Sequence, residues 1–184
     1  EETGAIRFDI KPICVYSVTG KNSVNETDEE TFGLLCFAEI TEFSGKLESE
    51  MKKVELMDEL PKNWTYPLIQ PKLIEKYLQI EKQSYSRIQL AAKQTIEYIK
   101  KIIKPGMNLL EIRKLCEEKL LESGADSFWY WDVGAFVFAG DETCVSVSGK
   151  QYVTSDRVIG NNDIITIDLS PQAGNIWGDY ARTI

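Results

Sequence analysis

Hydrophobic residues change their spacing along the chain, and this change predicts two different parts. Between residues 6 and 56 they fall in short runs separated by polar connections, as in β-strands, most clearly at 13–18 and 32–40. From Pro71 onward they recur every three or four positions, as on one face of a helix. We therefore predict an α+β chain with a first part at residues 1–78 and a second at residues 79–184.

The second part is predicted to begin with two amphipathic helices. Pro71 suits a first helical turn, and Pro105-Gly106 ends the first helix. A second helical face follows, and Gly124 stands where such a helix would stop. Residues 128–131 and 134–140 then have the composition of strands. We interpret the helical stripes as core positions: Tyr85, Ile88, Ala92, Ile96, Ile99, Ile103, Leu109, Ile112, Leu115, Cys116 and Leu120.

The last twenty residues predict a hairpin that carries two carboxylates. An apolar strand leads to Asp168, residues 171–175 supply turn residues, and a return strand begins at Ile176. A turn centred between Ala173 and Gly174 would place Asp168 directly opposite Asp179. Like charges at facing positions, about 5 Å apart, are destabilising, so the pair suggests a bound cation. The alternative interpretation is that Asp179 is an ordinary loop aspartate.

This hairpin resembles the first two metal ligands of the pita-bread metallopeptidases, a family of methionine aminopeptidases, Xaa-Pro peptidases and creatinase. The family pattern is an I-D-L strand end followed by G-D-x-x-R-T, which here are residues 167–169 and 178–183. Residues 104–108, Lys-Pro-Gly-Met-Asn, resemble the family's turn between its first two helices. The resemblance covers residues 80–184 and implies one αβ half of a pita-bread fold with an antiparallel sheet.

The resemblance also implies a chemistry. Asp168 and Asp179 would join a His and two Glu from the other half to hold two divalent ions, Mn²⁺, Co²⁺, Zn²⁺ or Fe²⁺, that hydrolyse a peptide substrate. The sequence contains no histidine. Gln151 stands where the family carries a substrate-binding His, and a Gln side chain cannot shuttle a proton. Because three of the five metal ligands would come from the other half, we expect the isolated chain to be inactive as a peptidase. A non-catalytic peptide- or protein-binding domain is the alternative.

The first part carries a second resemblance. The chain opens Glu-Glu-Thr-Gly-Ala, and residues 48–54 and 58–61 follow the two strand-like runs. These segments resemble the C-terminal portion of a Nudix hydrolase, which implies a partial α/β/α sandwich acting on a nucleoside or sugar diphosphate. Glu1 and Glu2 would then hold Mg²⁺ or Mn²⁺, and Glu50 would be a further ligand or a solvated acid. In one reading this portion is the only active part.

Both ends of the chain fall inside a motif, so we expect a fragment of a Nudix–metallopeptidase fusion, or a junction of two neighbouring genes. The net charge of −8 disfavours binding to nucleic acid, and no run approaches the ~20 apolar residues of a membrane span. The four cysteines show no C-x-x-C spacing. We predict a cytoplasmic protein without nucleic-acid or membrane partners.

Overall fold

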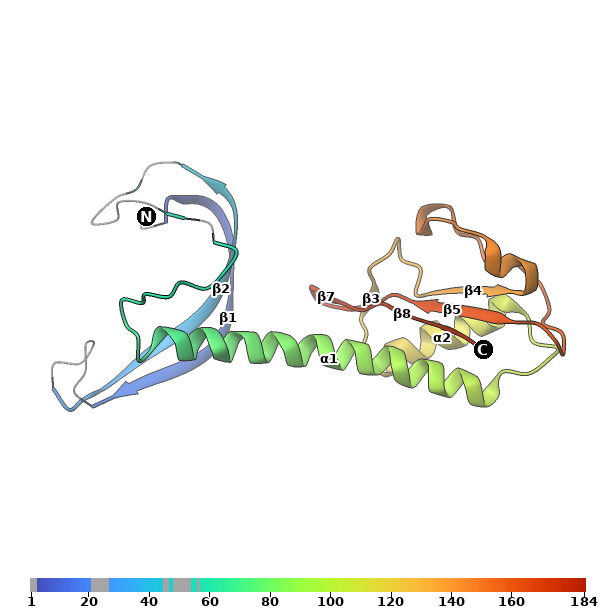
Figure 1. The fold of residues 1–184 in the computed structure, drawn as a ribbon, viewed down its shortest axis with the longest axis horizontal. Helices are drawn as coiled ribbons and strands as arrows, with labels where there is room; N and C mark the ends of the chain where they lie inside the picture. Colours follow the sequence, from blue (N-terminus) through green and yellow to red (C-terminus); the bar gives the residue numbers. More distant parts are fainter. Residues whose placement is uncertain (1–2, 21–26, 45–46, 48–53, 56) are drawn as a thin grey trace. The chain divides into compact units, whose positions relative to one another are not determined.

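The computed structural model describes residues 3–20, 27–44, 47, 54–55 and 57–184. It divides into two compact units, Glu1–Gln79 and Ile80–Ile184, and the course of the chain is drawn in Figure 1. Both helices and antiparallel strands are present, so the mixed architecture predicted from the spacing of apolar residues is confirmed. The candidate metal ligands Asp168 and Asp179 belong to the second unit.

The first unit contains one long antiparallel strand pair. Strand β1 (Ala5–Thr19) pairs with β2 (Glu30–Phe43), and a register shift lies between Pro12 and Cys14. The two strands contain the runs predicted at 13–18 and 32–40 and extend beyond both. The rings of Phe37 and Tyr77 are stacked, with centroids 5.7 Å apart and an interplanar angle of 4°.

Helix α1 (Gln70–Ile102) begins close to the predicted Pro71 and continues through the predicted boundary without a break. Its second-unit portion buries the expected stripe, including Ile88, Ala92, Ile96 and Ile99, whereas Tyr85 is 39% exposed. Within the described part of the chain, no helix combines the length and apolar character that crossing a membrane requires.

Helix α2 (Leu109–Glu122) has caps that the sequence encodes at both ends. The side chain of Asn108 accepts a hydrogen bond from the backbone N–H of Glu111 at 2.8 Å. After the last turn, Gly124 takes φ +109°, and the N–H groups of Gly124 and Ala125 donate to the carbonyls of Leu121 and Leu120. This is the Schellman arrangement, so the helix ends at the predicted glycine.

Two three-stranded antiparallel sheets complete the second unit. One has the order β3 (Ser127–Phe128), β6 (Pro171–Ala173), β7 (Ile176–Trp177). The other has the order β4 (Ala135–Ala139), β5 (Ile165–Leu169), β8 (Tyr180–Thr183), drawn side by side in Figure 1. Two short 3₁₀ helices, Gly140–Cys144 and Gly149–Gln151, lie in the β4–β5 connection. Residues of α1, α2, β4 and β5 form one buried core.

The strand predicted at residues 128–131 is wrong beyond Phe128. Residues 129–132 form a turn in which the N–H of Val133 donates to the carbonyl of Tyr130 at 3.2 Å. Trp131 and Asp132 both take positive φ, +59° and +57°. Local aromatic β-propensity is overridden here because the chain must reverse between β3 and β4, which belong to different sheets.

Candidate metal centre

Asp168 lies on the polar side of β5, at the central strand of its sheet. Along this strand Ile165, Ile167 and Leu169 are buried in the core, so the alternate positions face the other side. Asp168 lies opposite Phe136 on β4 and Ala181 on β8. The carboxylate is therefore flanked by an aromatic ring on one neighbouring strand and a methyl group on the other.

Asp179 follows β7 and precedes β8, and the predicted register of the hairpin is wrong by two residues. Asp168 faces Ala181, not Asp179. The cause is the turn, which is formed by Gly174 and Asn175, because Ala173 pairs with Ile176. Gly174 takes φ +57° at the first central position, where a type II′ hairpin turn has glycine. A turn shifted by one residue moves every facing partner by two.

A shift of two residues keeps the same side of the sheet, so Asp179 still lies diagonal to Asp168. The two carboxyl groups interact. Burial is the main cause that raises the pKa of Asp168 to about 6, and the negative charge of Asp179 and a hydrogen bond with it raise the pKa further. The N–H of Leu169 acts in the opposite direction. Asp179 itself is exposed to solvent.

The carboxylate pair fits a divalent cation on the chemistry of its donors. Carboxylate oxygens are the ligands that hard and borderline divalent ions share. A cation between the two groups would replace their repulsion, which the raised pKa of Asp168 reports, by attraction. Among the described residues, this region included, no group of three or more His, Cys, Asp or Glu could hold a metal ion. The Nudix-like candidates Glu1, Glu2 and Glu50 lie outside the described residues.

Gln151 is not part of the carboxylate pair's immediate surroundings. It is an exposed residue at the end of a 3₁₀ helix and lines a pocket of about 240 Å³ with Phe138, Tyr152 and several valines. Neither Asp168 nor Asp179 lines this pocket. The pocket and the pair are nevertheless related through β4, because Phe138 lies two residues along the strand from Phe136, on the same side of the sheet.

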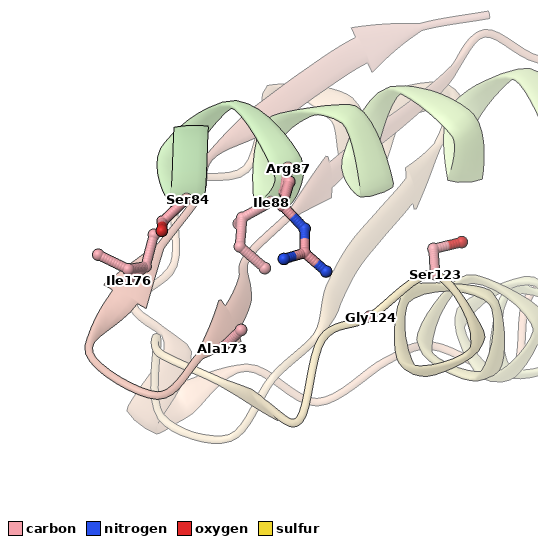
Figure 2. Close-up of a pocket in the computed structure, with 7 residues that line it drawn as sticks. All are labelled: Ser84, Arg87, Ile88, Ser123, Gly124, Ala173 and Ile176. Atoms are coloured by element: carbon pink, nitrogen blue, oxygen red, sulfur yellow. The ribbon is translucent and has the colours of Figure 1, made fainter. Parts of the chain in front are cut away.

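A second pocket, of about 210 Å³, lies beside the hairpin turn (Figure 2). Its lining joins α1, the end of α2 and the β6–β7 hairpin: Ser84, Arg87, Ile88, Ser123, Gly124, Ala173 and Ile176. Figure 2 shows the guanidinium of Arg87 directed toward the space beneath the helix. No described lining residue of this pocket is acidic, so it is distinct from the carboxylate pair.

Two residues that contact the Asp179 segment were not identified as site residues from the sequence. Trp129 donates a hydrogen bond from Nε1 to the carbonyl of Gly178 at 2.8 Å, and Gln89 donates from Nε2 to the carbonyl of Asp179 at 3.2 Å. In the sequence, Trp129 belongs only to the strand predicted at residues 128–131. Gln89 adjoins the buried Ile88 on α1, but helical spacing alone gives no sign of its partner, 90 residues along the chain.

Comparisons with known proteins identify the second unit. The family model described as "Metallopeptidase family M24" matches residues 83–184. Similar solved structures include the X-Pro aminopeptidase from Thermotoga maritima MSB8, with 21% identity and TM-score 0.49 over 58% of this chain and 28% of that chain. The prolidase from Pyrococcus furiosus has 20% identity and TM-score 0.49 over 56% of this chain and 29% of that chain. The prolidase from Pyrococcus horikoshii OT3 has 24% identity and TM-score 0.44 over 60% of this chain and 28% of that chain.

A comparison with curated proteins gives no match. The chain spans less than a third of the length of each of the three solved structures named.

Proposed function

The chain belongs to metallopeptidase family M24, and from that membership we propose that it carries part of a divalent-metal-dependent peptidase domain of the aminopeptidase or Xaa-Pro dipeptidase type. The observation that supports this proposal most is the interaction of the carboxyl groups of Asp168 and Asp179, which lie diagonal to each other at one side of the β4–β5–β8 sheet. Two acidic groups beside an apolar strand are costly to keep together without a cation. A peptide is the proposed substrate.

In this proposal Asp168 and Asp179 hold Mn²⁺, Co²⁺, Zn²⁺ or Fe²⁺. When bound, such ions supply Lewis acidity and an activated water for hydrolysis. Asp168 contributes a half-buried oxygen donor whose proton must leave before it can bind a cation, since its pKa is about 6. Binding of the cation should therefore weaken as the pH falls through about 6.

Titration of the chain with Mn²⁺ by isothermal calorimetry at pH 7.5 tests the metal site. We expect binding that Asp168→Asn and Asp179→Asn each weaken by at least about tenfold, whereas Asp156→Asn, at an exposed position, leaves it unchanged. Absence of binding, or binding that neither substitution alters, would overturn the proposal. Cleavage of a Met-peptide or Xaa-Pro dipeptide by the chain, abolished by Asp179→Ala, would contradict our expectation that it is inactive by itself.

A non-catalytic peptide-binding function is the second candidate, and Gln151 favours it. This residue lines an apolar pocket with Phe138 and Tyr152 on the side of the sheet that carries Asp168. Its amide can donate to a peptide carbonyl but cannot transfer a proton. Peptide binding that persists in a chelator and is lost in Gln151→Ala would support this function over hydrolysis.

For the first unit we propose the C-terminal part of a Nudix hydrolase acting on a nucleoside or sugar diphosphate with Mg²⁺ or Mn²⁺, in a cytoplasmic protein. The long pairing of β1 with β2 supports this proposal, since it contains both strand runs on which the resemblance rests. An assay of phosphate release from such diphosphates tests it, on this chain and on any protein that joins this unit to the rest of a Nudix motif. Activity there, with none on peptides, would make this unit the only active part.

A further inference from the structure

The Asp179 segment has little strand pairing of its own. Gly178 and Asp179 stand between β7 and β8 and belong to neither strand. The N–H of Gly178 donates to the carbonyl of Pro171 at 2.8 Å, and Tyr180, directly after Asp179, pairs with Leu169 on β5. The side chain of Asp179 is solvent-exposed and is repelled by the nearby Asp168. Contacts with other elements act on the two residues that lie between these paired positions.

Trp129 supplies the first of these contacts. Its indole Nε1 donates to the carbonyl of Gly178, immediately before Asp179. The indole is itself held, because its ring packs against Trp177 with centroids 4.9 Å apart and its backbone N–H donates to the carbonyl of Ser170 at 3.2 Å. The donor therefore reaches Gly178 from a fixed point at the end of β3.

Gln89 supplies the second contact from α1. Its Nε2 donates to the carbonyl of Asp179, the next carbonyl along the chain. The preceding residue, Ile88, lies directly against Gly178: a Cβ added to this glycine would be 2.7 Å from Cγ2 of Ile88. Glycine thus allows the segment to approach the helix closely enough for the Gln89 hydrogen bond.

We propose that Trp129 and Gln89 are positioning residues that hold Asp179 beside Asp168 and thereby set the affinity of the pair for a divalent cation. Two consecutive carbonyls, each bound by a donor from a different element, leave the Asp179 backbone little freedom to move away from the like charge. A ligand set that is held in place before the cation arrives loses less conformational entropy on binding. This inference rests on the proposed metal-binding function.

The test is Mn²⁺ titration by calorimetry of the whole chain carrying Trp129→Phe or Gln89→Met. Each variant removes one donor and keeps a side chain of similar size. We expect a 10- to 100-fold weaker affinity, roughly the loss seen when groups that orient metal ligands are removed. Trp131→Phe and Gln94→Met are the matched controls: Trp131 is 59% exposed, and Gln94 is exposed on the same helix as Gln89. Both should bind as the unaltered chain does.

A double-mutant cycle separates positioning from general destabilisation. In a chain that already carries Asp179→Asn, Trp129→Phe should cause little further loss of affinity, because the group that it positions is no longer a charged ligand. Equal losses in both backgrounds would overturn the inference, since they would indicate a structural effect. If Trp129→Phe does not fold, Gln89→Met in the same cycle decides the question.

The outcomes distinguish this inference from the proposed function. Wild-type binding that Asp168→Asn and Asp179→Asn abolish, but that Trp129→Phe and Gln89→Met leave unchanged, overturns the inference and keeps the proposed function. If the unaltered chain binds no Mn²⁺, or if neither aspartate substitution matters, both are overturned.

Discussion

The hydroxyl of Tyr152 hydrogen-bonds to the backbone at the edge of the sheet that carries Asp168, and removing it should lower the free energy of unfolding. It accepts a hydrogen bond from the N–H of Val137 at 2.8 Å and donates one to the carbonyl of the same residue at 3.1 Å. Val137 lies on β4, an outer strand of the β4–β5–β8 sheet as the structure describes it. One tyrosine hydroxyl thus serves both backbone groups that a further strand would otherwise pair.

The expected cost follows from burial on both sides of these hydrogen bonds. Tyr152 is 9% exposed and Val137 is 1% exposed. In Tyr152→Phe the N–H and the C=O of Val137 both lose their partner in an environment with little water. Each buried unsatisfied group costs about 1–3 kcal/mol, so for the two groups we expect a loss of about 2–6 kcal/mol in the free energy of unfolding. The ring contact with Phe136, with centroids 4.5 Å apart, is kept.

Urea denaturation followed by tryptophan fluorescence measures this loss, and hydrogen exchange should show faster exchange at the amide of Val137. The control is Tyr130→Phe, because the ring of Tyr130 also packs against Phe136, with centroids 5.7 Å apart. The reasoning would be refuted if Tyr152→Phe cost no more than the control, or if the Val137 amide kept its protection.

Three further predictions concern the second unit. The pKa of Asp168 is raised from 3.8 to about 6, so the stability that its protonated form contributes is lost as the pH rises from about 4 to about 6. In the presence of a chelator, Asp168→Asn should therefore stabilise the chain by about 1–2 kcal/mol at pH 7, allowing for the partial exposure of Asp168, and by almost nothing at pH 4. Urea titrations at the two pH values measure this difference. Burial raises the pKa of Cys116 to about 12, so iodoacetamide followed by mass spectrometry should modify the exposed Cys144 and spare Cys116 until the chain unfolds. Gly178→Ala should destabilise the chain by about 1–3 kcal/mol because its Cβ would meet Ile88, and adding Ile88→Ala should cost less than the sum of the single losses in thermal unfolding.

The helices and the core could be predicted from the sequence because they depend on periodicity and capping. Ile88, Ala92, Ile96 and Ile99 recur at helical spacing, and all four are buried. Local chemistry also marks the end of α2, where Gly124 has the positive φ that favours glycine. These features are decided by residues close together in the chain, so a single sequence contains the necessary information.

The position of the candidate site could be predicted only in part. Asp168 and Asp179 were assigned to the same side of one hairpin, and alternation along strands preserves that side even when the register shifts by two. The facing partner itself depends on which residues form the turn, and Gly174-Asn175 competes with neighbouring positions that are almost as suitable. Trp129 and Gln89 could not be found, because their hydrogen bonds span 49 and 90 residues.

The surroundings of Asp168 connect the stability of the sheet with its proposed chemistry. Phe136, which faces Asp168, packs its ring against the rings of Tyr152 and Tyr130. The ring of Tyr130 in turn packs against that of Trp129. Phe136 lies opposite Asp168, and burial is the main cause that raises the pKa of this carboxyl group. The series of rings ends at the indole that binds the carbonyl before Asp179. Burial therefore disfavours the charged form of one carboxylate, while the Trp129 indole acts on the position of the other, and a divalent cation bound between them would gain from both effects.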